Sequence, residues 1–287
     1  MQPNYKKIFM RRFYMAIITI SRQVAAHGDE VAACLAEKLG YKFVTRQQIE
    51  NRIVELGFPE SKLQKYDERK PVFFASMAKD RDLYLNLSQY AMLENAVAGN
   101  CIFIGRGAFA VFYGLPNHFS VRVVADEKTR LERLEKEFDW NEKQARQRIS
   151  ESDTNRDGFH KNFYNVDVAE PSNYNMVINT GFATEEFCAQ TIADYIKPQL
   201  SEQKEVAANE KLNKMLVAQS VVNKLITEKS INIQFVYVTI EDKTIIVHGV
   251  SDSIGPVEQA LKLIKQDLPD FEVQSAVSII NDFKMYH

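Results

Sequence analysis

The chain has 287 residues, 45% of them hydrophobic and 26% charged, and its formal net charge is -2. This length buries a sizeable core in one large domain or two smaller ones, and we expect two. The near-neutral charge offers no global attraction to nucleic acid, and no segment approaches the roughly 20 apolar residues of a membrane-spanning helix, so neither a nucleic-acid partner nor an integral membrane segment is expected.

The first predicted strand follows a basic, aromatic stretch. Residues 1–14 lack the apolar run of a secretory signal and are interpreted as an N-terminal extension. Residues 15–21 are continuously apolar and β-branched, which is typical of a strand buried on both faces of a parallel sheet. The amphipathic helix that follows should end at Gly40. Thr45 and Gln48 then predict a capping box for a second helix, after a short strand over residues 41–44.

Strands and helices continue to alternate up to residue 200. Residues 57–82 lose the period and are interpreted as an irregular insertion. The later elements are predicted as a helix over 83–98, strands over 101–105 and 118–126, a charged helix capped by Asp126, a helix from Asn141 to about Glu151, a strand over 175–179 and a helix over 185–196. This alternation predicts an α/β domain over residues 15–200, with a parallel sheet.

A different unit follows. Residues 201–211 show neither a strand nor a core pattern, and they fit either a linker or an exposed helical lead-in. Beyond them the sequence predicts helices over 212–228 and 254–268 and strands over 235–240, 244–248 and 272–280. The order α-β-β-α-β predicts a small α+β domain over residues 212–287, with both helices on one face of its sheet. An exposed strand at the sheet edge leaves homo-oligomerisation open.

Four segments of the first unit carry a family resemblance. They are TISRQ (19–23), IFIGRG (102–107), RISESDTNR (148–156) and PSNYNMVINT (171–180). In this order they resemble the cytidylate-kinase-like family, which implies a P-loop kinase-like parallel sheet flanked by helices. The segment TIIVHGVSDSIGPVEQALKLI (244–264) resembles the BON domain, which implies a small module that contacts ligands or phospholipid.

The stretch after the first strand stands where a phosphate-binding loop would lie. The pattern G-x-x-x-x-G-K-[ST] needs glycines for close backbone approach and a lysine for charge. An ungapped overlay puts Arg22 and His27 at the two glycines, Gly28 at the lysine and Asp29 at the metal-binding hydroxyl. One interpretation is a plain strand-to-helix turn, in which Asp29 and Glu30 would repel a triphosphate. The other is a degenerate P-loop in which Arg22 and His27 contact phosphate, with Gly28 and Asp29 beside them.

Arginines supply the remaining candidates. By resemblance, Arg106 occupies the position that contacts the acceptor nucleotide, and its alternative is a turn arginine paired with surface carboxylates. Arg148, Asp153 and Arg156 resemble the lid segment that closes over phosphates, and their alternative is a solvated helix face. Arg130 and Arg133 are expected to be solvated. The three cysteines and five histidines show no metal-ligand spacing, so no metal site is predicted, and the cysteine usage fits a cytoplasmic protein.

Two functions fit this sequence. The first, implied by the resemblance, is a phosphotransferase, active or impaired, that uses ATP and Mg²⁺ to phosphorylate a nucleoside monophosphate or a related small molecule. The second is a non-catalytic, kinase-derived protein that senses a nucleotide or a small phosphorylated ligand, with the BON-like unit as its contact module. The sequence does not identify the acceptor.

Overall fold

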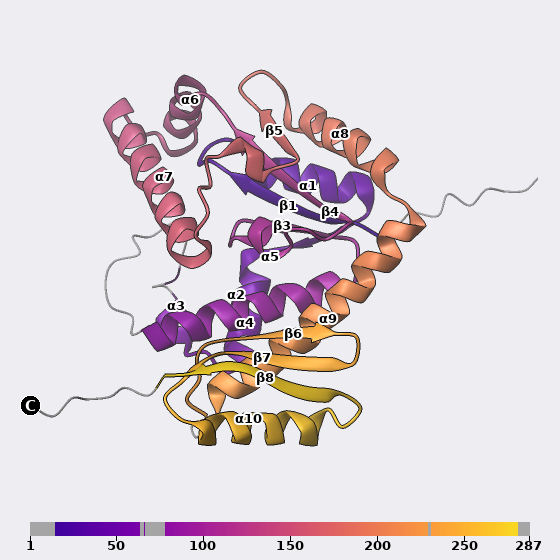
Figure 1. Cartoon of the computed structure of the whole chain (residues 1–287). Coiled ribbons are helices and arrows are strands. Elements are labelled where there is room, and N and C mark those ends of the chain that lie inside the picture. The colour runs from indigo at the N-terminus through magenta and orange to yellow at the C-terminus, as the bar shows by residue number, and fades with distance from the viewer. Residues whose placement is uncertain (1–14, 64–65, 67–77, 229–230, 281–287) are drawn as a thin grey trace, which may run out of the picture.

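The computed structural model describes residues 15–63, 66, 78–228 and 231–280. Five strands form the sheet of the first domain in the order β2-β3-β1-β4-β5, and all of their pairings are parallel. The strands are β1 (Ile17–Arg22), β2 (Lys42–Val44), β3 (Cys101–Ile104), β4 (His118–Val124) and β5 (Met176–Asn179). Helices flank this sheet, which confirms the predicted α/β class (Figure 1).

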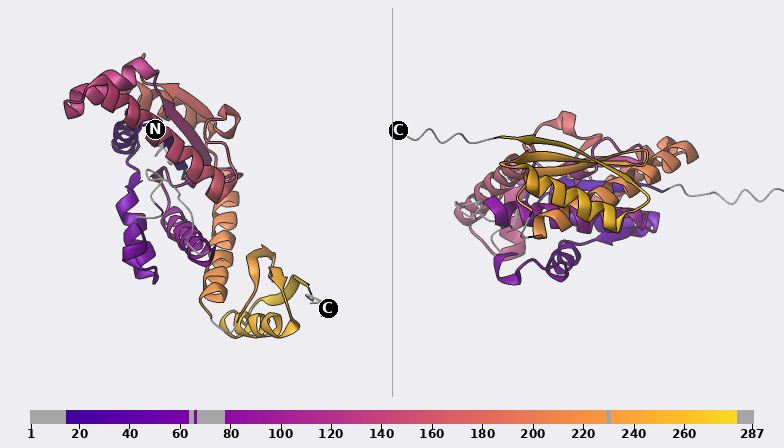
Figure 2. Two further views of the ribbon diagram at one scale, coloured as in Figure 1. Left: turned by 90° about the vertical axis from the view of Figure 1, so that its left-hand side faces the viewer. Right: turned by 60° about the horizontal axis from the view of Figure 1, so that its bottom comes forward.

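Helices cover both faces of the sheet because side chains alternate along β1. Ile18 and Ile20 pack with α1 and α8, whereas Ile17 packs with α2, α4, α5 and α7. The ribbon views of Figure 2 show helices on both sides of the strands. The helices of this domain are α1 (Gly28–Leu39), α2 (Arg46–Glu55), α3 (Glu60–Leu63), α4 (Ala78–Val97), α5 (Ala108–Val111), α6 (Glu127–Phe138), α7 (Glu142–Tyr164) and α8 (Glu185–Ile196), with the short 3-10 turns η2 (Pro171–Asn173) and η3 (Lys197–Gln199).

Local signals in the sequence set several helix ends. Gly40 ends α1 in the left-handed conformation, and Thr45 and Gln48 form the predicted capping box of α2. The helix that Asn141 caps runs to Tyr164 rather than to about Glu151, because its buried face continues to Phe163. The segment predicted as an irregular insertion contains α3 and the start of α4, and residues 64–65 and 67–77 of it lie outside the described residues.

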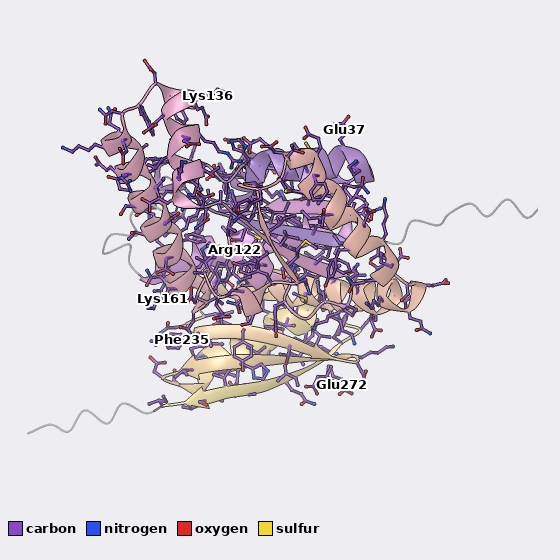
Figure 3. All side chains as sticks on the ribbon, turned by 90° about the horizontal axis from the view of Figure 1, so that it is seen from above. Glu37, Arg122, Lys136, Lys161, Phe235 and Glu272 are labelled. Atoms are coloured by element: carbon purple, nitrogen blue, oxygen red, sulfur yellow. The ribbon has the colours of Figure 1, made fainter. Side chains whose placement is uncertain are left out.

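The C-terminal domain has the predicted order of elements. It consists of α9 (Glu202–Thr227), β6 (Gln234–Glu241), β7 (Thr244–Ser251), α10 (Ile254–Asp267) and β8 (Glu272–Ile279). In this sheet β7 pairs antiparallel with β6 and parallel with β8. Both helices pack on the face that carries Val238 and Val247, whereas Phe235 is exposed (Figure 3). Among the described residues, no helix has both the length and the apolar character that crossing a membrane requires.

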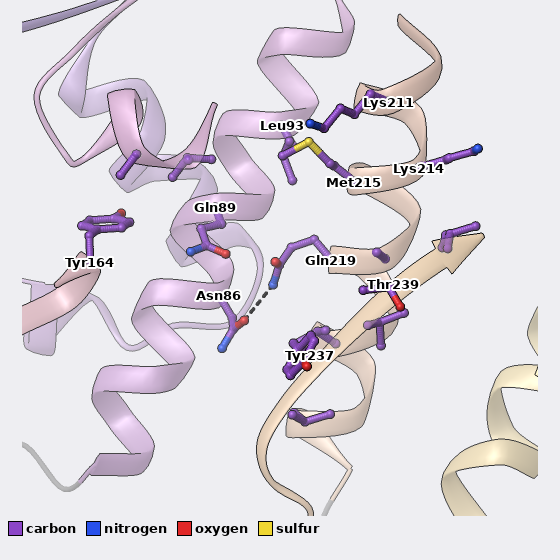
Figure 4. A pocket seen from close by; sticks show the side chains of 17 residues that line it. Asn86, Gln89, Leu93, Tyr164, Lys211, Lys214, Met215, Gln219, Tyr237 and Thr239 are labelled. Atoms are coloured by element: carbon purple, nitrogen blue, oxygen red, sulfur yellow. Dashed lines mark hydrogen bonds between the residues drawn. The ribbon is translucent and has the colours of Figure 1, made fainter. Parts of the chain in front are cut away.

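Helix α9 joins the two domains. Residues 202–211 form its first turns, and Leu212, where the sequence placed the start of the second domain, is buried in the core of the first. Val221 and Leu225, further along, belong to the core of the second. A cavity of about 510 Å³ lies between α9, α4 and β6, and Gln219 donates to Asn86 across it at 2.8 Å (Figure 4).

Candidate functional site

The loop from Gln23 to His27 connects β1 to α1 and makes its turn without glycine. Ala25 has a φ of 57° and His27 a φ of 54°, both in the left-handed region that usually favours glycine. His27 immediately precedes α1, at the position of the second glycine in the phosphate-loop pattern. The backbone therefore holds left-handed conformations at non-glycine residues.

The carbonyl groups of this loop are held by side chains from α6 and from the end of β5. Arg130 Nε donates to the carbonyl of Val24 at 2.9 Å, Arg133 Nη1 donates to that of Ala25 at 3.0 Å, and Thr180 Oγ1 donates to that of Ala26 at 2.8 Å. In the described part of the chain, the N–H groups of residues 24, 25, 27 and 28 reach no backbone carbonyl. Such N–H groups before a helix are suited to bind an anion.

Arg130 and Arg133 are therefore not the solvated residues that the sequence predicted. Arg130 is 4% exposed, and its Nη2 contacts both carboxylate oxygens of Asp153 on α7 at 2.8 and 2.9 Å. Arg133 is half-buried and also donates from Nη2 to the carbonyl of Thr180 at 2.8 Å. Each arginine immediately precedes a buried leucine, Leu131 or Leu134. This spacing places both arginines beside the buried face of α6, and it was the signal in the sequence that could have predicted their burial.

The four residues predicted to bind the phosphoryl donor lie together at the start of α1; they are Arg22, His27, Gly28 and Asp29. Arg22 Nε donates to Asp29 Oδ2 at 3.2 Å. A Cβ added to Gly28 would come within 2.5 Å of the Cβ of Arg22, so the arginine stem lies against this glycine. His27 Nδ1 forms a hydrogen bond with Glu185 at the start of α8, and this bond lowers the pKa of Glu185 below its usual value.

Arg106 lies between two glycines that, like Arg106 itself, have positive φ. Arg106 is 3% exposed, and its guanidinium forms an ion pair with Glu50 and donates to Tyr84 Oη and the carbonyl of Tyr66, each at 2.7 Å. Tyr164 Oη donates to the carbonyl of Arg106 at 2.9 Å. As an alternative to an acceptor contact, the sequence suggested that Arg106 pairs with surface carboxylates. The structure shows a pair with one carboxylate, that of Glu50, and this pair is buried.

Helix α7 touches both regions. Asp153, in the middle of α7, pairs with Arg130, which contacts the loop between β1 and α1. Tyr164, at the end of α7, donates to the carbonyl of Arg106. Arg156 is 8% exposed and donates to Ser152, and Arg148 is half-buried nearer the start of the helix. The structure therefore connects Asp153 with the loop, whereas Arg148 and Arg156 are placed only on the same helix.

Comparison with known proteins identifies the family. The model of the cytidylate kinase-like family matches residues 17–181, which is more than half of the chain. The chain belongs to the cytidylate kinase-like family. The matched residues run from β1 to just beyond β5 and include the loop, the Arg106 turn and α7. The C-terminal domain lies outside the match, and no curated protein matches the chain.

Solved structures similar to the first domain have low sequence identity. An uncharacterized protein from Eubacterium ventriosum is 19% identical over 63% of this chain and 98% of its own, with a TM-score of 0.49. Shikimate kinase from Acinetobacter baumannii, in complex with shikimate, is 16% identical over 63% and 93%, with a TM-score of 0.36. Shikimate kinase from Bacteroides thetaiotaomicron is 15% identical over 63% and 98%, with a TM-score of 0.39.

Proposed function

We propose that the protein is a phosphotransferase that transfers the terminal phosphoryl group of ATP to a nucleoside monophosphate or a related small molecule. The observation that carries this proposal is the orientation of the loop after β1. Arg130, Arg133 and Thr180 donate to three consecutive loop carbonyls, whereas several loop N–H groups reach no backbone carbonyl among the described residues and can bind the phosphates of ATP. Membership of the cytidylate kinase-like family supports the same chemistry.

The residues at the start of α1 fit a nucleotide and Mg²⁺. Arg22 offers a cation for phosphate oxygens, and its pairing with Asp29 at 3.2 Å offsets the negative charge that would otherwise repel them. The Asp29 side chain is 59% exposed and carries carboxylate oxygens of the kind that Mg²⁺ prefers, so it could hold the ion. Bound Mg²⁺ would neutralise charge on the transferred group. We infer a degenerate P-loop in which Arg22 replaces the lysine charge, and His27 and Gly28 contribute N–H groups.

The remaining roles follow the family resemblance. Arg106 is proposed to contact the acceptor, and Arg148 and Arg156 to contact the moving phosphoryl group. Asp153 is proposed as a positioning residue, because it holds Arg130, which in turn holds the carbonyl of Val24. Arg106 would serve the acceptor together with its partner Glu50, so the two side chains form one unit.

The C-terminal domain is proposed to be a BON-like contact module. Its α-β-β-α-β order and its helices packed on one sheet face support this proposal, and the opposite face, with Phe235 77% exposed, is the candidate surface for a ligand or a second copy of the chain.

Calorimetric titration of the full chain tests the function. We expect saturable binding of Mg-ATP, separate binding of one monophosphate among CMP, dCMP and other nucleotides, and turnover when both are present. Arg22→Met should weaken Mg-ATP binding about tenfold or more, because it removes a charge-assisted contact. Lys38→Met is the matched control, since it removes an exposed cation at the opposite end of α1.

Other outcomes of this titration contradict the proposal in distinguishable ways. Binding of a monophosphate without any binding of Mg-ATP would support the non-catalytic sensor. The absence of binding by every nucleotide would indicate that the loop is only a strand-to-helix turn.

A further inference from the structure

Arg122 is a charged residue that stands between Val121 and Val123 in strand β4, and it has no role in the proposed function. It is 8% exposed, and its pairing partner in β1 is Ser21, the residue before Arg22. Figure 3 shows Arg122 well inside the first domain, whereas Lys136 and Lys161 lie at its rim. Arg122 therefore lies beside the strand end that leads into the candidate phosphate-binding loop.

Within the part of the chain that the structure describes, no carboxylate pairs with this buried charge. Across the described residues, no Asp or Glu oxygen lies within 4 Å of a nitrogen of the Arg122 side chain, whereas the buried arginines Arg106 and Arg130 pair with Glu50 and Asp153. Burying an arginine without a countercharge is costly, because the guanidinium loses its hydration. Among the described residues, Arg106 therefore has a countercharge in Glu50, whereas Arg122 has none within ion-pair distance.

Ser21 and Tyr174, the two described side chains that contact the Arg122 guanidinium, are neutral. Its Nη1 donates to Ser21 Oγ at 3.2 Å, and its Cζ lies 5.8 Å from the ring centroid of Tyr174. Tyr174 Oη donates to the carbonyl of Val168 at 2.9 Å. Burial raises the pKa of Tyr174, although Ser21 and Arg122 act in the opposite direction, so the phenol supplies no negative charge near neutral pH.

We propose that Arg122 and Ser21 form an anion subsite that receives a phosphate or carboxylate group of the acceptor. A guanidinium binds both groups through paired hydrogen bonds, and the Ser21 hydroxyl adds another donor. The acceptor would then be an anionic small molecule, and its anionic group would contact Arg122 in addition to any contact with the Arg106–Glu50 pair. The description of the anion as part of an acceptor rests on the proposed function, whereas the anion subsite itself does not.

Thermal unfolding in the absence of ATP tests the subsite. Wild type, Arg122→Met and Arg122→Lys are unfolded in anion-poor buffer and at rising concentrations of inorganic phosphate, with acetate at equal ionic strength as a carboxylate probe. We expect a saturable rise in Tm for the wild type with phosphate, acetate or both, and part of that rise for Arg122→Lys. Arg122→Met should lose this rise in Tm, because its apparent affinity for the anion should fall at least about tenfold.

The anion-poor measurement separates an anion subsite from a structural role. Arg122→Met should be at least as stable as the wild type there, because methionine removes an uncompensated buried charge while keeping much of the volume. A variant that unfolds at a clearly lower temperature, or that fails to fold, would overturn the proposal. Arg52→Met is the control: Arg52 pairs with Glu94 on the α2 side of the domain, and its loss should leave the anion response intact.

Arg22→Met distinguishes the two candidate anion positions. If the phosphate response persists in Arg122→Met and disappears in Arg22→Met, the anion binds at the loop and the subsite is wrong. If it disappears in Arg122→Met alone, the subsite is supported even where Mg-ATP fails to bind, so failure of the proposed function remains distinguishable. A wild type that responds to neither anion overturns the subsite.

Discussion

The side chain of Arg22 lies against Gly28, so that a Cβ on this glycine would approach the Cβ of Arg22 to 2.5 Å and its Cγ to 2.7 Å. In the phosphate-loop pattern these positions hold a glycine and a lysine, respectively. Here the cation stands at the end of β1 and the small residue at the start of α1. The exchange keeps one positive charge beside the loop, and the absence of a side chain at Gly28 leaves space for the side chain of Arg22.

Gly28→Ala tests this exchange. Although alanine favours the helix, the new methyl group should clash with Arg22, and we expect a loss of about 1–3 kcal/mol in the free energy of unfolding. In an Arg22→Gly background the same change should cost much less, because the stem is absent. Urea unfolding of the four proteins of this cycle measures the coupling. Equal costs in both backgrounds would show that the two residues do not compete for space.

Asp153→Asn tests the connection between α7 and the loop. The change leaves Arg130, which is 4% exposed, without its countercharge, and we expect a loss of about 1–3 kcal/mol in the free energy of unfolding. Mg-ATP affinity should fall as well, because Arg130 also holds the carbonyl of Val24. Asp157→Asn, at an exposed position one turn further along α7, is the control in both measurements. An Asp153 variant that matches this control would exclude the connection.

Much of the fold could be predicted because its signals are local. Capping residues such as Thr45 and Gln48 mark helix ends within a few residues, and continuous apolar runs mark the strands of a parallel sheet. The extension of α7 was missed because polar residues, Arg156 and His160, occupy part of its buried face. They hide the helical period that apolar residues would show.

The site was less predictable because its contacts join distant parts of the chain. Arg106 and its partner Glu50 are 56 residues apart, and Arg130 reaches a carbonyl 106 residues away. No local pattern identifies such a partner, so the sequence could nominate Arg106 but not its buried ion pair. Arg122 did leave a signal, since this charged residue interrupts a run of valines, Val121, Val123 and Val124.

Glu50→Gln tests the Arg106 unit. Both side chains are almost fully buried, so the change leaves an uncompensated cation and should cost about 3–5 kcal/mol in the free energy of unfolding. The double variant Glu50→Gln/Arg106→Met should recover part of this loss, because it removes the remaining charge. Denaturant unfolding of the single and double variants measures both effects. A double variant less stable than Glu50→Gln would mean that other contacts of Arg106 dominate its contribution.

His118 gives stability a specific pH dependence. Burial lowers the pKa of His118 to about 4, and a bond to the Phe112 carbonyl opposes this effect only in part. The unfolded chain, with an ordinary histidine pKa near 6.5, therefore binds a proton that the folded chain refuses between about pH 6.5 and 4. Stability is complete above this window and falls within it, by about 1 kcal/mol between pH 7.5 and 5.5.

His118→Gln should remove this part of the pH dependence, because glutamine can still bond Thr19, whose Oγ1 lies 2.8 Å from His118 Nε2. Unfolding at pH 7.5 and 5.5 measures the difference between the two proteins. His248→Gln is the control, since it replaces a histidine that bonds a threonine at 2.9 Å in the other domain. If the slopes of the wild type and His118→Gln agree, the proton uptake belongs to another group.

Leu212→Ala tests whether α9 is part of the first domain. Leu212 is fully buried in the core of that domain, together with residues of α2 and α4, and its truncation should cost about 2–5 kcal/mol in the free energy of unfolding. Val206→Ala, at a position of the same helix that is 62% exposed, should change it by no more than about 0.5 kcal/mol. A small effect at both positions would indicate that α9 only tethers the C-terminal domain. A large effect at Leu212 alone would mean that a truncation after residue 211 removes part of the core of the first domain. The role of the C-terminal domain must then be tested with a truncation beyond Leu216, which packs against the same core.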